Sequence, residues 1–288
     1  MNEPVRVLSD LHLGHRISRV ARVAALRPLI AGAGTVIFNG DTWQELAGKL
    51  YDRSREMLDE LRALCHEEGV EAIFLSGNHD PGWPGPGWVE LAGGRIVITH
   101  GDALLFDGSP WKREILVGGK RVMELWNQHP RADRDIEERL RVAREIAREL
   151  CSIEHPTGRH FLQRAWDAAI PPGRAVKMIE AWLIQASVGA KFCETYFPDA
   201  EVLVIGHFHH KGCWLRNGRR IINTGSFMAP GRADWLEWND GVLSRGVIDE
   251  SPETCRMGRT LDVWRLGISA GEKKLVHEDG IEPPTNPV

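Results

Sequence analysis

The stretch "VRVLSDLHLGH", residues 5–15, is the starting point for interpreting the whole chain. Its first four residues form a short β-branched and apolar run of the kind found in strands that are buried on both faces. Asp10 and His12 follow immediately, and both belong to the residue types that bind metal ions. An isolated D-x-H sequence is equally compatible with an ordinary polar loop. The role of this pair therefore depends on the rest of the chain.

The same arrangement recurs four more times along the sequence. Apolar runs at 35–38, 72–75, 95–99 and 201–205 are each followed by an acid, an amide or a histidine, with a glycine nearby. The side chains concerned, including the first pair, are Asp10, His12, Asp41, Asn78, His79, Asp80, His100, His207 and His209. Five unrelated polar loops would rarely all carry these residue types. We therefore expect the five strand ends to form one site.

Helical patterns separate the early strand runs. Residues 17–30 carry apolar side chains at helical spacing, and a second pattern begins near Ser54, a predicted N-cap, and ends near Gly69, a predicted C′ residue. Strands that alternate with helices predict a layered α/β domain. In such sheets ligands collect at the carboxyl ends of the strands, where neighbouring loops converge.

The sequence pattern changes in the second half of the chain. Residues from about 112 to 197 show long helical patterns, including an amphipathic segment at 133–150, and are predicted to form a helical insertion. The domain as a whole is predicted to span 1–267. Residues 268–288 are polar and contain prolines, which predicts a flexible C-terminal tail.

Composition narrows the class of protein. The 288 residues include 42% hydrophobic and 26% charged residues, which is ordinary for a globular chain. The net charge of −4 provides no general field for duplex nucleic acid, so no such partner is expected. No apolar run reaches the length of about 18 residues needed to span a bilayer. Five scattered cysteines fit neither a disulfide framework nor a zinc cluster, so a cytoplasmic location is expected.

The residue types at the strand ends favour a hydrolytic site with two metal ions. Carboxylates, an amide oxygen and neutral imidazoles suit divalent first-row cations, so Mn²⁺ is expected, with Fe, Zn or Mg as alternatives. Two such ions can share a carboxylate and a hydroxide, and the metal-bound hydroxide is a nucleophile near neutral pH. This arrangement serves the hydrolysis of phosphoesters.

Taken in order, the motifs resemble those of the calcineurin-like metallophosphoesterases. The matching blocks are D-x-H at Asp10, G-D at Asp41, G-N-H-D at Asn78, a single His100 and G-H-x-H at His207, and they extend over about residues 5–226. The resemblance implies an α/β fold of the αββα sandwich type. In this fold, two mixed β-sheets are flanked by helices, here with the helical insertion added.

The resemblance also implies roles for individual residues. One metal ion would be held by Asp10, His12, Asp41 and His209, and the second by Asp41, Asn78, His100 and His207. Asp41 would bridge the two ions. His79 would be the general acid or electrostatic stabiliser at the leaving group, with Asp80 orienting its ring.

Within the superfamily, the opening motif and the insertion resemble the UDP-2,3-diacylglucosamine pyrophosphate hydrolases. Two positions depart from that subgroup, which has Arg in place of His79 and Thr in place of Phe208. The expected partner is thus a phosphorylated small-molecule or lipid-linked substrate, and peripheral contact with the inner membrane remains open. The alternatives are a general nucleotide or phosphodiester phosphodiesterase and, third, a non-catalytic scaffold of the same fold.

Overall fold

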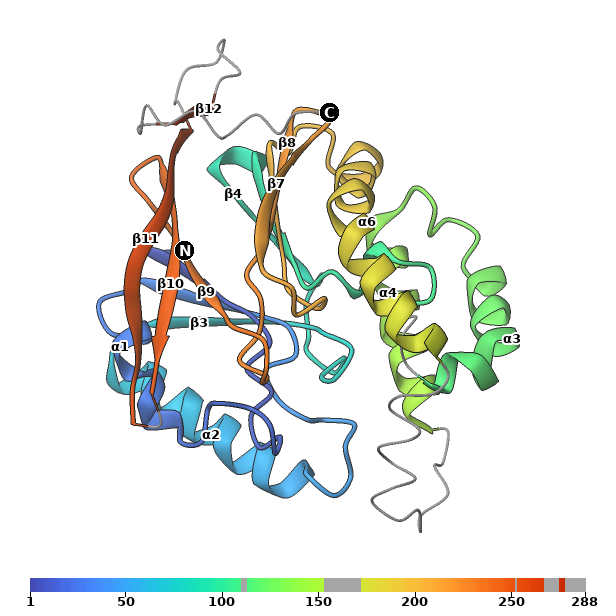
Figure 1. The fold of residues 1–288 in the computed structure, drawn as a ribbon, viewed down its shortest axis with the longest axis horizontal. Coiled ribbons are helices and arrows are strands. Elements are labelled where there is room, and N and C mark those ends of the chain that lie inside the picture. The colour runs from blue at the N-terminus through green and yellow to red at the C-terminus, as the bar shows by residue number, and fades with distance from the viewer. Residues whose placement is uncertain (110–112, 153–171, 252, 267–274, 278–288) are drawn as a thin grey trace.

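The chain forms two β-sheets that pack face to face and are flanked by helices (Figure 1). The structure is a computed structural model that describes residues 1–109, 113–152, 172–251, 253–266 and 275–277. The strands are β1 Val5–Leu8, β2 Thr35–Asn39, β3 Glu71–Leu75, β4 Trp88–Leu91, β5 Ile96–Thr99, β6 Val202–Ile205, β7 Gly212–Arg216, β8 Arg219–Asn223, β9 Asp234–Asn239, β10 Val242–Glu250, β11 Cys255–Leu266 and β12 Leu275–His277.

Both sheets are mixed. The seven-stranded sheet has the order β12-β11-β10-β9-β1-β2-β3, in which β1, β2 and β3 are parallel and β9 runs antiparallel to β1. The five-stranded sheet has the order β4-β5-β6-β8-β7, with parallel β5, β6 and β8 between two antiparallel edge strands. The carboxyl ends of β1 and β2, and those of β5 and β6, therefore lie at common edges.

Apolar side chains fill the space between the sheets. Val7 and Ile37 from the first sheet and Val204 and Ile222 from the second belong to one buried cluster. A second cluster joins the outer face of the seven-stranded sheet to helix α2, and a third joins the five-stranded sheet to α6. Four layers result, and the predicted αββα sandwich is confirmed.

Helix α2, Tyr51–Glu67, covers the outer face of the seven-stranded sheet with Leu58 and Leu61. Gly69 follows its C-cap with φ of +67°, as predicted. The N-cap prediction for Ser54 is wrong, because the helix begins three residues earlier. Its buried hydroxyl instead accepts a hydrogen bond from the backbone N of Gln44 at 2.8 Å and donates one to a loop carbonyl.

The helix predicted for residues 17–30 is largely absent. Only the 3₁₀ turn η1, Val23–Leu26, and the short helix α1, Arg27–Ile30, form there. The preceding segment pairs with the loop after β8, because Ser18 forms an isolated bridge with Met228. Tertiary pairing therefore overrides the helical spacing of the apolar residues.

Three α-helices are described between β5 and β6. They are α3 Arg113–Gln128, α4 Ile136–Ser152 and α6 Pro172–Tyr196, and they lie beyond the five-stranded sheet (Figure 1, right). Of the predicted insertion at about 112–197, residues 112 and 153–171 lie outside the described residues. Of the predicted tail only β12 is described, and it pairs with β11. None of the described helices combines the length and apolar character that crossing a bilayer requires.

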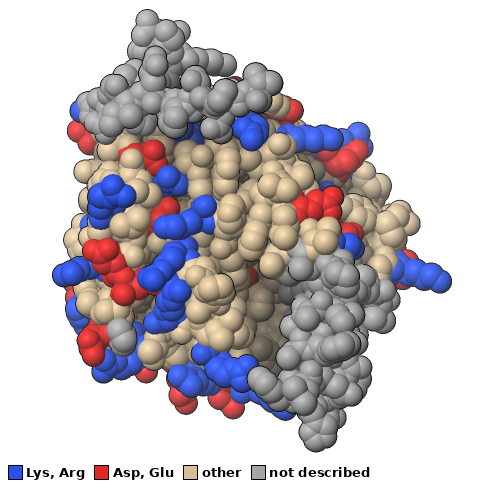
Figure 2. Space-filling model, in the orientation of Figure 1, with Lys and Arg blue, Asp and Glu red and all other residues tan. Residues whose placement is uncertain are grey.

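The charged surface on the side shown in Figure 2 is mixed. Lys and Arg side chains are interspersed with Asp and Glu over the seven-stranded sheet, which lies to the left in this view. This distribution agrees with the small net charge of −4.

Candidate metal centre

The predicted ligands occupy strongly bent strand ends. Eight described residues other than glycine have a positive φ, and five of them are candidate ligands: Asp10, His12, Asp41, His207 and His209. A left-handed backbone costs an L-residue about 1–2 kcal/mol. Such conformations persist where the surrounding structure imposes them, and their concentration at one place is typical of a functional site.

The first group of candidate ligands is Asp10, His12, Asp41 and His209, whose ligand atoms all lie within 4.8 Å of one another. Nε2 of His209 lies 3.1 Å from an Asp10 carboxylate oxygen and 3.2 Å from Nε2 of His12. Nε2 of His12 lies 3.7 Å from Oδ2 of Asp41. Three of the four residues are buried, and His209 is half-buried at the mouth of the site.

The second group shares Asp41 and adds His100 and His207. Nε2 of His100 lies 3.4 Å from the same Asp41 oxygen, Oδ2. Oδ1 of Asn78 and Nε2 of His100 are buried and have no hydrogen-bond partner among the described residues. Buried polar atoms are nearly always satisfied, so two orphaned ligand atoms at one place indicate a cation site. This donor set fits a divalent metal ion.

Backbone carbonyls orient the rings of the second group. Nδ1 of His100 lies 2.9 Å from the carbonyl oxygen of Asn39, and Nε2 of His207 lies 3.2 Å from that of Gly108. Each carbonyl accepts a hydrogen bond from an N–H of its ring, so the other ring nitrogen of His100 and of His207 is the one that could bind a metal ion. Metal-binding histidines are commonly oriented in this way.

Asp80 organises the loop that carries Asp41. Its Oδ1 accepts hydrogen bonds from the backbone N of Asp41 and of Gly77, both at 2.9 Å. Its Oδ2 accepts from the backbone N of Thr42 at 2.8 Å and from Nε1 of Trp83 at 3.0 Å. The predicted catalytic role of Asp80 stays a prediction, while its hydrogen bonds show what it holds in place.

Glycines beside the ligands permit close approach. A Cβ at position 77 would collide with the carboxylate and backbone N of Asp41, and one at position 206 would collide with the Asp10 carboxylate. The glycines next to Asn78 and His207 therefore leave room for the two carboxylates.

Gln44 lies between the rings of His12 and His79 and was not singled out from the sequence. In the structure, Nε2 of its amide lies 2.9 Å from Nδ1 of His12 and Oε1 lies 3.0 Å from Nδ1 of His79. An amide has a donor on one side and an acceptor on the other, and its two orientations are isosteric. A metal ion at Nε2 of His12 requires Oε1 to face that ring. The amide NH₂ then donates to Nδ1 of His79, which places the His79 proton on Nε2.

The ionisation of the site is set by burial and by ion pairing. Burial alone would raise the pKa of Asp41, but the charges of His100 and His79 hold this pKa well below its ordinary value. Burial would likewise lower the pKa of His100, yet Asp41 and then Asp10 keep it well above the ordinary value. Burial lowers the pKa of His12 well below the ordinary value. Without metal, His100 and Asp41 form an ion pair while His12 is neutral.

Two further carboxyl groups are affected mainly by burial. Burial raises the pKa of Asp10. Burial, followed by repulsion from Asp41, raises the pKa of Asp80 to about 8, and the hydrogen bond from Trp83 opposes this rise.

A cavity of about 400 Å³ opens over the two groups. Asp41, Asn78 and His79 lie at its polar end. Its apolar walls include Ile17, Met178, Trp182, Met228, Ala229 and Pro230. His210, beside the ligands in sequence, is exposed and stacks on the indole of Trp182 at 5.0 Å between ring centroids.

Comparisons with known proteins give matches to solved structures alone. No protein-family model matches the chain, and no curated protein matches it. A single mutant of Vps29 from Entamoeba histolytica is 16% identical over 90% of this chain and 98% of that chain, with a TM-score of 0.43. A dimetal phosphatase from Danio rerio is 12% identical over 90% of this chain and 99% of that chain, with a TM-score of 0.41.

A predicted phosphoesterase from Streptococcus pneumoniae is 16% identical over 89% of this chain and 95% of that chain, with a TM-score of 0.34. At these identities and scores the matches carry no argument about activity. The function of this chain has to be argued from its own site.

Proposed function

We propose that the chain is a phosphoesterase that depends on two divalent metal ions. One observation carries the proposal: Oδ2 of Asp41 lies 3.7 Å from Nε2 of His12 and 3.4 Å from Nε2 of His100. A single carboxylate thus faces two sets of ligands. Two neighbouring cations that share a carboxylate form the type of centre that cleaves phosphoesters.

The two ligand sets overlap at Asp41. The first is Asp10, His12, Asp41 and His209, and the second is Asp41, Asn78, His100 and His207. The two cations would act as Lewis acids on the phosphoryl oxygens and would acidify the attacking water. Mn²⁺ suits the mixture of carboxylate, amide and imidazole ligands, as do Fe and Zn.

His79 is placed to serve the leaving group. Its side chain is one-third exposed, lines the cavity and has Nε2 at 4.0 Å from Oδ2 of Asp41. In the amide orientation that a metal ion on His12 requires, Gln44 would donate to Nδ1 of His79, and Nε2 of His79 would then carry the proton. His79 would donate this proton, or a hydrogen bond, to the oxygen that leaves.

The cavity favours a substrate with an apolar group beside its phosphate. Met178 and Trp182 of α6 and Met228 of the loop after β8 provide apolar contacts next to the ligands. A phosphodiester, a phosphomonoester or a pyrophosphate bond could each reach the centre. Among these, a lipid-linked pyrophosphate of the UDP-2,3-diacylglucosamine type uses the apolar walls most fully, and a soluble phosphodiester is the alternative.

The test is a side-by-side assay of the protein loaded with Mn²⁺. Bis(p-nitrophenyl) phosphate, p-nitrophenyl phosphate and UDP-2,3-diacylglucosamine are compared, with Asp41→Asn as the inactive variant. Asp102→Asn is the control, because Asp102 is also buried but belongs to neither ligand group. Turnover that requires Asp41 and tolerates Asp102→Asn supports the proposal. A fully metal-loaded protein that hydrolyses none of the three compounds overturns it.

A further inference from the structure

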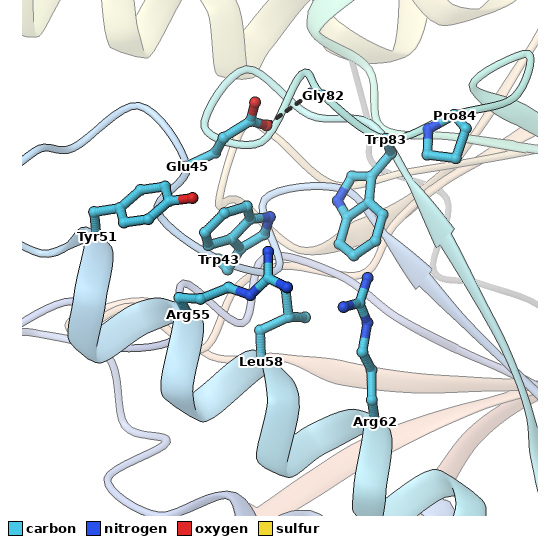
Figure 3. A pocket seen from close by; sticks show the side chains of 9 residues that line it. All are labelled: Trp43, Glu45, Tyr51, Arg55, Leu58, Arg62, Gly82, Trp83 and Pro84. Carbon is cyan, nitrogen blue, oxygen red and sulfur yellow. Dashed lines mark hydrogen bonds between the residues drawn. The ribbon is translucent and has the colours of Figure 1, made fainter.

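A second cavity lies between helix α2 and the loops after β2 and β3 (Figure 3). Its volume is about 300 Å³, at the lower end of the range for small-molecule sites. Trp43, Trp83, Arg55, Arg62, Glu45 and Tyr51 are among its walls, and no candidate metal ligand is. The cavity is thus separate from the proposed metal centre.

An indole N–H points into this cavity. Trp43 is only 6% exposed. Its backbone N donates a hydrogen bond to Asp80, whereas its indole Nε1 makes no hydrogen bond among the described residues. In Figure 3 this indole nitrogen is directed toward the space between the two tryptophans. This nitrogen can therefore donate a hydrogen bond to a ligand in the cavity that offers an acceptor.

Two guanidinium groups approach the cavity from α2. Cζ of Arg55 lies 5.9 Å from the centroid of the Trp43 ring, and Cζ of Arg62 lies 5.2 Å from that of Trp83. Within the described residues, Asp59 accepts hydrogen bonds from Nε of Arg55 and Nη1 of Arg62 and from no other group. Both Nη groups of Arg55, together with Nε and Nη2 of Arg62, make no hydrogen bond within the described part of the chain. These donors remain available to an anion.

The opposite wall offers an acceptor. Oε2 of Glu45 accepts a hydrogen bond from the backbone N of Gly82 at 2.7 Å, which fixes the carboxylate (Figure 3). Its other oxygen has no donor among the described residues. The indole of Trp83 borders the cavity and is stacked on Phe74 at 4.5 Å between centroids, so the wall that it forms is rigid and flat.

We propose that this cavity is a second ligand site and that it binds an aromatic monophosphate of the size of a nucleoside monophosphate. The phosphate would accept hydrogen bonds from Arg55, Arg62 and Nε1 of Trp43, because guanidinium groups match the geometry of phosphate oxygens. The ring would lie against the indole of Trp83, as bases do on aromatic side chains. An N–H group on the ring would donate to Glu45.

The arginines are the residues to change. The indole of Trp83 donates to Asp80, and Trp43 is part of the buried cluster under α2, so replacing either tryptophan would also disturb the surrounding structure. Arg55 and Arg62 are 46% and 43% exposed and form hydrogen bonds with Asp59 alone among the described residues. Arg121, on α3, is equally exposed at 43% and is paired with acidic side chains, which makes Arg121→Gln the matched control.

The experiment is calorimetric titration of AMP into the full-length protein after treatment with EDTA. Removing metal ions prevents phosphate from binding through cations at the other centre, so the result does not depend on the phosphoesterase proposal. We expect one AMP per chain, and adenosine and inorganic phosphate alone should each bind at least about tenfold more weakly. Arg55→Gln and Arg62→Gln should each weaken binding about fivefold or more, while Arg121→Gln leaves it unchanged.

Three results would overturn the proposal. The first is the absence of saturable AMP binding at millimolar concentration. The second is binding that neither arginine substitution on α2 weakens. The third is inorganic phosphate binding as tightly as AMP, because the aromatic wall would then make no contribution.

Discussion

Replacing Asp80 with Asn is expected to destabilise the protein strongly, although the two side chains have nearly the same shape. The Asp80 carboxylate has no donor of its own when ionised, and one of its oxygens accepts from Asp41 N and Gly77 N. The other oxygen accepts from Thr42 N and from Nε1 of Trp83. In Asp80→Asn, the new amide must point its NH₂ group toward one of these pairs of donors.

The magnitude follows from these contacts. In either orientation of the amide, at least two buried N–H groups lose their acceptor. An unsatisfied buried donor costs about 1–3 kcal/mol, so the free energy of unfolding should fall by about 2–6 kcal/mol. The same change releases the backbone of Asp41, so metal binding should weaken as well.

The assay is urea unfolding of the metal-free protein at pH 9. This pH lies above the Asp80 pKa of about 8, so the Asp80 carboxyl is mostly ionised and the comparison concerns hydrogen bonds to the carboxylate. Asp102→Asn is the control, since Asp102 is buried and, among the described residues, accepts one hydrogen bond, from Ala103 N at 3.0 Å. Its substitution should cost about 1 kcal/mol. Equal losses for the two variants, or a loss below about 1 kcal/mol for Asp80→Asn, would refute the reasoning.

Three further predictions concern the metal centre. In Gln44→Glu the new side chain offers acceptors only, so the proton of His79 should move from Nε2 to Nδ1 and kcat should fall about a hundredfold. The tautomer is visible in ¹⁵N spectra of the zinc-loaded protein, and an unchanged tautomer would contradict this prediction. Because the raised pKa keeps His100 protonated without metal, binding of Mn²⁺ should release a proton and tighten as pH rises. Calorimetric titrations in buffers of different ionisation enthalpy measure the number of protons released, and a value of zero would count against this prediction. Gly77→Ala should weaken metal binding and lower the free energy of unfolding by about 1–3 kcal/mol. Gly48 has open space around it, so Gly48→Ala should do neither, and equal effects of the two substitutions in urea unfolding would argue against steric exclusion at Gly77.

The strand ends were the part of the structure that the sequence predicted best. The apolar runs are short, so each ends close to a polar residue, and the runs that lead to Asp10, Asp41 and His100 are all strands. Residues that follow parallel strands converge for a general reason of sheet geometry. The residue types alone were therefore enough to predict that these side chains meet, and the structure brings them together.

Other features depended on contacts that no local pattern encodes. The edge strands β4 and β7 were not predicted, because "WVEL" and "GCWLR" have no clear alternation. The local sequence predicts a helix start at Ser54, yet its hydroxyl accepts a hydrogen bond from the backbone N of Gln44 in a distant loop. Gln44 is one polar residue in a loop, and only the fold places its amide between two histidine rings.

The central claim is that Asp41 bridges two metal ions, and metal counting tests it most directly. Protein loaded with Mn²⁺ and freed of excess metal should contain two ions per chain by elemental analysis. Asp41→Asn should lose both ions or bind them far more weakly, because it weakens a ligand of each site. Asp102→Asn should retain two. A wild-type chain that holds one ion, or an Asp41→Asn chain that keeps two at unchanged affinity, would contradict the account.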